Sequence, residues 1–107
     1  MSDKEMEKEI VSLGLTAPRV TLASIEALMA KVTYDVHVIP DTTTTLATAM
    51  LDGFSLATEQ TACVDKANFN AELGAKYAIE AAKASAQSKL WELEGYALKK
   101  QLAADKE

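Results

Sequence analysis

Few side chains in this sequence of 107 residues have the types and spacing that catalysis or metal binding requires. His37 is the only histidine and Cys63 the only cysteine, so neither has a partner at the spacing of nitrogen and sulfur metal ligands. Apart from His37, the sequence has no histidine that could activate Cys63 as a nucleophile. We interpret Cys63 as a small apolar residue and His37 as a side chain on a half-exposed strand.

Phosphate-loop chemistry and acid-pair chemistry are not expected either. The glycines are too far apart for a phosphate loop, and no GxGxxG or Walker pattern occurs. Glu92 and Glu94 flank Leu93 on a predicted helix and so point in different directions, which excludes them as a catalytic pair. We therefore predict a protein that is not an enzyme and uses no cofactor or metal. An enzymatic alternative would have to rely on carboxylates and tyrosine.

Arg19 has the most informative setting of any single residue. It is the only arginine, and it stands in the segment Pro18-Arg19-Val20-Thr21, directly before a predicted helix start. A guanidinium beside the free N–H groups of a helix N-terminus can hold phosphate or carboxylate through two hydrogen bonds. A structural interpretation is also open, in which Arg19 pairs with a helix carboxylate such as Glu94 and joins the two halves of the chain.

Four further residues complete a hypothetical ligand site around Arg19. In this hypothesis Thr21 and Lys89 contact phosphate together with Arg19, and Trp91 or Tyr96 stacks on a base. The alternative is that both aromatic rings belong to the apolar stripe of a helix and pack in the core.

The first element that must position these residues is a predicted helix over residues 2–13. Ser2 and Glu5 form a capping-box pattern, and Gly14 supplies the left-handed residue that ends a helix. The apolar stripe of this helix is narrow, so we expect it to be weakly held and available to a partner. The stripe consists of Met6, Ile10 and Leu13.

The middle of the chain predicts a second helix and an antiparallel sheet. Thr21 is a candidate N-cap for a helix from Leu22 to about Lys31, and the alternation over residues 33–39 is typical of a strand. Asp52-Gly53 predicts a type I′ hairpin between two further strands. A two-residue loop would place Leu51 opposite Phe54, Ala49 opposite Leu56 and Ala47 opposite Thr58. The expected core face is then Leu51, Phe54, Ala49, Leu56, Ala47 and Ala62.

From Asp65 or Asn68 almost to its end, the chain has the period of one long helix. Some 30 helical residues span about 45 Å, whereas a compact domain of this length is about 35 Å across. Unless Gly95 breaks the helix, one end projects and exposes large apolar side chains, which predicts a homo-oligomer. The alternative is a monomer whose helix ends or bends near Gly95. The side chains concerned are Leu90, Trp91, Leu93, Tyr96 and Leu98.

These elements predict an α+β fold: N-terminal helices, a three-stranded antiparallel meander with an Asp-Gly hairpin, and a long C-terminal helix packed on the sheet. We expect one domain over residues 1–107, with a peripheral helix at 1–14 and a core at 15–104. Eleven basic and 16 acidic residues give a net charge of −5 without a basic stripe, so neither nucleic acid nor a membrane is an expected partner. The charged N-terminus and single cysteine fit a reducing cytoplasm.

Several segments together resemble a known family. They are residues 15–21, 62–65, 68–74 and 89–96, of which Pro18-Arg19-Val20-Thr21 and Leu90-Trp91-Glu92-Leu93-Glu94-Gly95-Tyr96 are the most specific. The chain resembles a family of small tailed-bacteriophage proteins, the gene-product-forty-nine and gene-product-sixty-six family, over about residues 15 to 102. It departs from the pattern at residues 57–60, where a strand containing glycine is commoner, and at Asp65-Lys66, which replaces Asp-Pro.

The resemblance implies a phage origin and expression in the cytoplasm of an infected bacterium, and it implies no activity. By analogy with other small phage proteins, our first hypothesis is a homo-oligomer that sequesters a nucleotide-type defence signal of the host. The alternative is a protein-interaction module that binds a host protein through its N-terminal helix and inhibits or redirects it.

Overall fold

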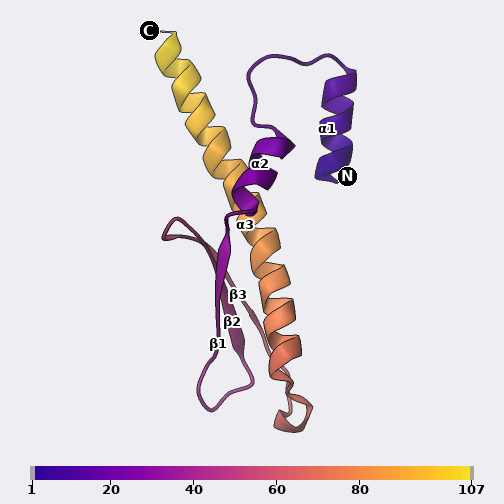
Figure 1. Ribbon diagram of the computed structural model, residues 1–107, viewed down its shortest axis with the longest axis vertical. Helices are drawn as coiled ribbons and strands as arrows, with labels where there is room; N and C mark the ends of the chain where they lie inside the picture. The colour runs from indigo at the N-terminus through magenta and orange to yellow at the C-terminus, as the bar shows by residue number, and fades with distance from the viewer. Residues whose placement is uncertain (1, 107) are drawn as a thin grey trace.

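The computed structural model describes residues 2–106 and confirms the α+β architecture. Met1 and Glu107, the ends of the predicted domain, lie outside the described residues. A three-stranded antiparallel sheet in the order β1-β2-β3 packs along one half of a long helix, and two shorter helices lie beside the other half (Figure 1). The elements are α1 Asp3–Ser12, α2 Leu22–Met29, β1 Thr33–Val38, β2 Thr45–Leu51, β3 Phe54–Thr61, the 3-10 helix η1 Lys66–Asn68 and α3 Ala71–Asp105.

Helix α3 sets the shape of the molecule. It has 35 residues and continues through Gly95, so the alternative in which the helix ends or bends there is wrong. The molecule measures 59 × 30 × 19 Å, and the C-terminal end of α3 extends past α2 (Figure 1). The apolar side chains predicted to project divide into two groups. Leu90 is buried and Trp91 and Leu98 are half-buried, whereas Leu93 and Tyr96 are exposed.

The predicted helix caps are confirmed. Ser2 Oγ accepts a hydrogen bond from the N–H of Glu5 at 3.2 Å, and the Glu5 carboxylate accepts one from the N–H of Ser2 at 3.4 Å. Gly14, after the end of α1, has φ of +68°. Thr21 Oγ1 accepts from the N–H of Ser24 at 3.1 Å and so caps α2, which ends two residues before the predicted Lys31.

The hairpin turn is confirmed, but the register beyond it differs from the prediction. Asp52 and Gly53 have φ of +51° and +80°, as a type I′ turn requires, and Leu51 lies opposite Phe54. A β-bulge follows, between Ala49 and Met50. The extra residue places Ala49 opposite Ala57 and Ala47 opposite Glu59, instead of the predicted Leu56 and Thr58.

The bulge also changes which β3 side chains face α3. Glu59 now lies on the helix side, where its carboxylate accepts a hydrogen bond from Ser85 at 2.9 Å. Thr58 lies on the outer face. Phe54 is 58% exposed and Ala62 is exposed, so both were wrongly assigned to the core. Phe54 stands at the hairpin tip, which points away from α3 (Figure 1).

Small side chains line the contact between α3 and the sheet. Two alanines of β2 and three of α3 are fully buried, so the helix axis can approach the strands closely. Gly74 continues this close approach toward the start of α3, since a Cβ there would lie 2.7 Å from Thr45 Oγ1. The core cluster is Ile25, Ala47, Ala49, Leu56, Ala78, Ala82, Ala86 and Leu90.

The two glycines inside α3 predict opposite effects of substitution. Gly74→Ala is expected to lower the free energy of unfolding by about 1 kcal/mol, because overpacking against buried Thr45 outweighs the better helix propensity of alanine. Gly95→Ala is expected to raise it by up to about 1 kcal/mol, because nothing lies within 4 Å of the added methyl group. Urea unfolding followed by circular dichroism measures both changes. Shifts of the same sign and size would contradict the close packing at Gly74.

Candidate ligand-binding site

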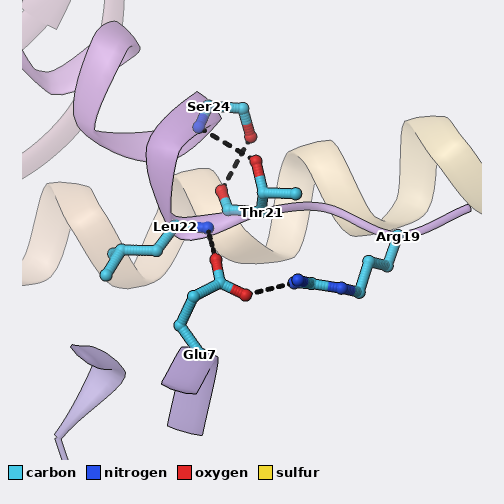
Figure 2. Close-up of polar contacts among 5 residues, drawn as sticks. All are labelled: Glu7, Arg19, Thr21, Leu22 and Ser24. Atoms are coloured by element: carbon cyan, nitrogen blue, oxygen red, sulfur yellow. Dashed lines mark hydrogen bonds and ion pairs between the residues drawn. The ribbon is translucent and has the colours of Figure 1, made fainter. Parts of the chain in front are cut away.

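The donor groups around Arg19 are occupied by an acidic side chain of α1. The Glu7 carboxylate accepts a hydrogen bond from the backbone N–H of Leu22, at the start of α2, and its other oxygen forms an ion pair with Arg19 (Figure 2). Arg19 therefore forms an internal ion pair with a helix carboxylate beside the N-terminus of α2, the kind of contact that the structural interpretation describes. The internal partner is Glu7 on α1, in place of the suggested Glu94 on the long helix.

A second carboxylate of α1 makes the equivalent contact with α3. Asp3 Oδ2 accepts hydrogen bonds from Gln87 Nε2 at 2.9 Å and from Trp91 Nε1 at 3.0 Å. Asp3 and Glu7 are four residues apart, so both point from the same face of α1. Two carboxylates thus engage four hydrogen-bond donors supplied by the segment before α2, by α2 itself and by α3.

A cavity of about 310 Å³ remains between α1 and the rest of the molecule. Its walls are mainly apolar, with Arg19 and the two carboxylates as the charged groups. Arg19 and Trp91, two of the predicted site residues, both line it. The lining residues are Asp3, Met6, Glu7, Ile10, Arg19, Val20 and Trp91.

Thr21 is adjacent to this site, but its polar atoms serve helix α2. Its hydroxyl accepts from the N–H of Ser24, and its carbonyl accepts from the Ser24 hydroxyl at 2.8 Å (Figure 2). The residue therefore fixes the start of α2, and through it the direction of the Leu22 N–H that meets Glu7.

Lys89 and Tyr96 lie on a different side of α3 from Trp91. With 3.6 residues per turn, they are about 160° and about 140° around the helix axis from Trp91. Lys89 pairs with Glu92 at 3.5 Å, and the Tyr96 side chain is exposed. A single chain therefore does not bring these two residues to the cavity that Arg19 and Trp91 line.

The other candidate residues are not assembled into a site. His37 is exposed, with its Nδ1 3.3 Å from Asp35. Cys63 is half-buried, lies two residues after the end of β3, and donates a weak hydrogen bond to the carbonyl of Asp65 at 3.4 Å. Among residues 2–106, no group of three or more histidine, cysteine or acidic side chains has the geometry to hold a metal ion.

The electrostatics of Glu7 predict how acid affects the docking of α1. The hydrogen bond from Leu22 N–H lowers the pKa of Glu7, partial desolvation opposes this, and Arg19 lowers the pKa further. Because the pKa of Glu7 in the folded state is below its ordinary value of 4.5, the stabilisation by Glu7 is fully present above about pH 4.5 and is lost as the pH falls through the folded-state pKa.

Trp91, the only tryptophan, contacts Asp3 of α1 and reports this loss. We expect its fluorescence emission to shift to longer wavelength on acidification below about pH 4.5, as α1 leaves the indole. In Glu7→Gln the contribution of this carboxyl to the titration disappears, and an acid transition unchanged in Glu7→Gln would contradict the assignment.

Sequence reasoning missed Asp3, Glu7 and Gln87. A signal for the first two was present, because Asp3, Met6, Glu7 and Ile10 follow the i, i+3, i+4, i+7 spacing of a single helix face. Two acids on the docking face of a helix indicate donors opposite them. Gln87 has no comparable signal in the sequence.

Among the described residues, none of the helices has the length and the apolar composition of a membrane-spanning segment. Comparison with known proteins matches residues 20–102 to one family model, described as "Phage protein (N4 Gp49/phage Sf6 gene 66) family". Neither a curated protein nor a solved structure matches the chain. Helix α1 lies outside the matched residues, whereas α2, the sheet and most of α3 lie inside them.

Proposed function

Because the chain belongs to the N4 Gp49/phage Sf6 gene 66 family of phage proteins, we propose that it acts in the cytoplasm of the infected bacterium as a homo-oligomeric binding protein without enzymatic activity. Its ligand is a phosphorylated nucleotide of the kind that a host uses as a defence signal, which the protein sequesters. The observation that carries this proposal is that Arg19 and Trp91 line one cavity, and that the Leu22 N–H at the start of α2 contacts the same carboxylate as Arg19.

The chemistry of this cavity suits a nucleotide. The guanidinium and the Leu22 N–H already hold one carboxylate, and the same donors match the oxygens of a phosphate. The indole ring of Trp91 offers an apolar face on which a base can stack.

The surface area supports the oligomer. The accessible surface of the described chain is 7643 Å², whereas a compact monomer of 11.5 kDa exposes about 5,800 Å². An interface of standard size buries about 800 Å² on each partner. The excess of about 1,800 Å² therefore corresponds to about two such interfaces on each chain. Leu93 and Tyr96 are 41% and 70% exposed and lie on the same side of α3 as Lys89. In an oligomer, this side of α3 can supply Lys89 and Tyr96 to the cavity of a neighbouring copy.

The test is a binding titration with phosphorylated nucleotides, with the unphosphorylated nucleosides as ligand controls. Saturation at 100 times the dissociation constant adds about 2.7 kcal/mol to the free energy of unfolding, which raises the melting temperature. Arg19→Ala is expected to weaken binding by about 10- to 150-fold, since it removes a charge-assisted hydrogen bond. Lys31→Ala, which removes an exposed positive charge elsewhere, is the matched control. No rise in melting temperature with any phosphorylated nucleotide would count against the proposal.

A second candidate function, binding to a host protein, is favoured by apolar side chains at the end of α1. Val11, Leu13 and Leu15 are all more than half exposed. In this alternative the segment inhibits or redirects a host protein. Deletion of residues 1–13 would then abolish capture of that protein, and capture that survives the deletion would exclude this surface.

A further inference from the structure

We propose that helix α1 is an internal competitor for the ligand site. Its two carboxylates, Asp3 and Glu7, bind the donors that would hold two anionic groups of a ligand, so ligand binding and α1 docking exclude each other. This inference rests on the proposed function and deepens it, because it names the ligand class as a nucleotide with two separated anionic groups.

The surface beneath α1 presents four hydrogen-bond donors to its carboxylates. It consists of the Arg19 guanidinium, the Leu22 N–H, the Gln87 amide and the Trp91 indole N–H. Among residues 2–106, the hydrogen bonds and the ion pair that these four groups make all go to carboxylates of α1. Side chains four residues apart on a helix are about 6 Å apart at Cβ. The donors form two pairs, one on Glu7 and one on Asp3, and are therefore arranged for two separate anions, as in a nucleotide with phosphates on both sides of its ribose.

Helix α1 is held in a way that permits its release. It has 10 residues, none of them buried, and a helix this short is not stable in water by itself. The segment of residues 13–18 that joins it to the rest of the chain is exposed throughout. Release of α1 therefore uncovers the four donors without opening the core between α3 and the sheet.

The fit of α1 over the site is incomplete. A cavity of about 310 Å³ stays open between Met6 and Ile10 on one side and Val20 and Trp91 on the other. The carboxylates satisfy the donors, but the apolar space beside Trp91 is not filled by α1. A nucleotide that matches both anion positions and also packs its base on Val20 and Trp91 makes apolar contacts that α1 lacks, which is the differential affinity that displacement requires.

Competition by α1 raises the apparent dissociation constant of the ligand, because only the undocked fraction of the protein binds it. Neutralising the two carboxylates while keeping all four donors should therefore strengthen binding. This direction separates the proposal from a purely structural role of α1, for which loss of the contacts would leave affinity unchanged or reduced.

The experiment uses the full chain and adenosine 3′,5′-bisphosphate as the probe. In Asp3→Asn/Glu7→Gln we expect the apparent dissociation constant to fall by at least about tenfold relative to the unmodified protein. The matched control is Glu5→Gln/Glu9→Gln, which removes two carboxylates from the exposed part of the same helix. Glutamine also serves in the capping box, so the control keeps α1 helical and its affinity should change by less than about twofold.

Hydrogen exchange of the α1 amides gives the second readout. In the unmodified protein, the probe should speed up exchange over residues 5–12 while the α3 amides opposite the sheet keep their protection. Equal affinities in the double variant and the unmodified protein, or binding with α1 still protected, would overturn the competition and leave the proposed function standing. If the probe binds to neither protein although Trp91 emission shows α1 released in the double variant, both the inference and the nucleotide function are overturned.

Discussion

Leu90→Ala is expected to lower the free energy of unfolding by about 2–5 kcal/mol, the largest loss that we predict for one substitution in this chain. Leu90 is 4% exposed and belongs to the same buried cluster as Ile25. Five of the eight members of that cluster are alanines, so the few large side chains supply most of its apolar volume. Their removal leaves a cavity that the rigid surfaces of α3 and the sheet cannot close.

The measurement is the urea midpoint, with circular dichroism as the signal and the slope checked for constancy. Leu73→Ala is the control, because it deletes the same atoms from the same helix at a side chain that is 50% exposed. We expect Leu73→Ala to lower the free energy of unfolding by less than half as much as Leu90→Ala. Leu90→Met, which keeps the volume, should cost less than about 1.5 kcal/mol and shows that the loss comes from the cavity. Equal losses for Leu90→Ala and Leu73→Ala would contradict the assigned core.

Leu93→Glu/Tyr96→Glu is expected to dissociate the proposed oligomer, with a rise of at least about 1,000-fold in the dissociation constant. Both side chains are exposed in the isolated chain. Truncation of a central interface residue typically lowers the binding free energy by about 2 kcal/mol or more. The glutamates would also bring uncompensated charge into the interface. Sedimentation equilibrium reports the mass, which should fall to the 11.5 kDa of one chain.

Two glutamates elsewhere on α3 control for the added charge. In the variant Ser88→Glu/Gln101→Glu, both glutamates stand at exposed positions of α3. Each lies about 110° around the helix axis from the direction midway between Leu93 and Tyr96. The control variant should keep the mass of the unmodified protein. An unmodified protein that sediments as a monomer at high concentration would refute the oligomer directly.

The features that sequence reasoning predicted correctly are those determined by neighbours along the chain. The capping box at Ser2, the cap at Thr21 and the turn at Asp52-Gly53 each depend on a few consecutive residues, and all three are confirmed. The long helix is confirmed for the same reason, since its apolar period and its lack of internal proline are local properties.

The features that were missed depend on the packing of distant segments. No glycine in the sequence indicates the bulge at Ala49 and Met50, and the bulge shifts the pairing of the rest of β3 by one residue. The partner of Arg19 was missed because Glu7 stands 12 positions away, across a connection with no periodicity of its own. In the candidate site, Arg19 and Trp91 line one cavity, which depends on the packing of distant segments, whereas the position of Lys89 and Tyr96 on another side of α3 already follows from the 3.6-residue period of a helix.

The alanine-lined contact between α3 and the sheet also sets how stability varies with temperature. A methyl group buries little apolar area, and one chain leaves 7643 Å² exposed. The heat-capacity increase on unfolding grows with the apolar area that unfolding exposes. A single chain therefore has a small heat-capacity increment and a broad, shallow stability curve, whose height changes little over tens of degrees.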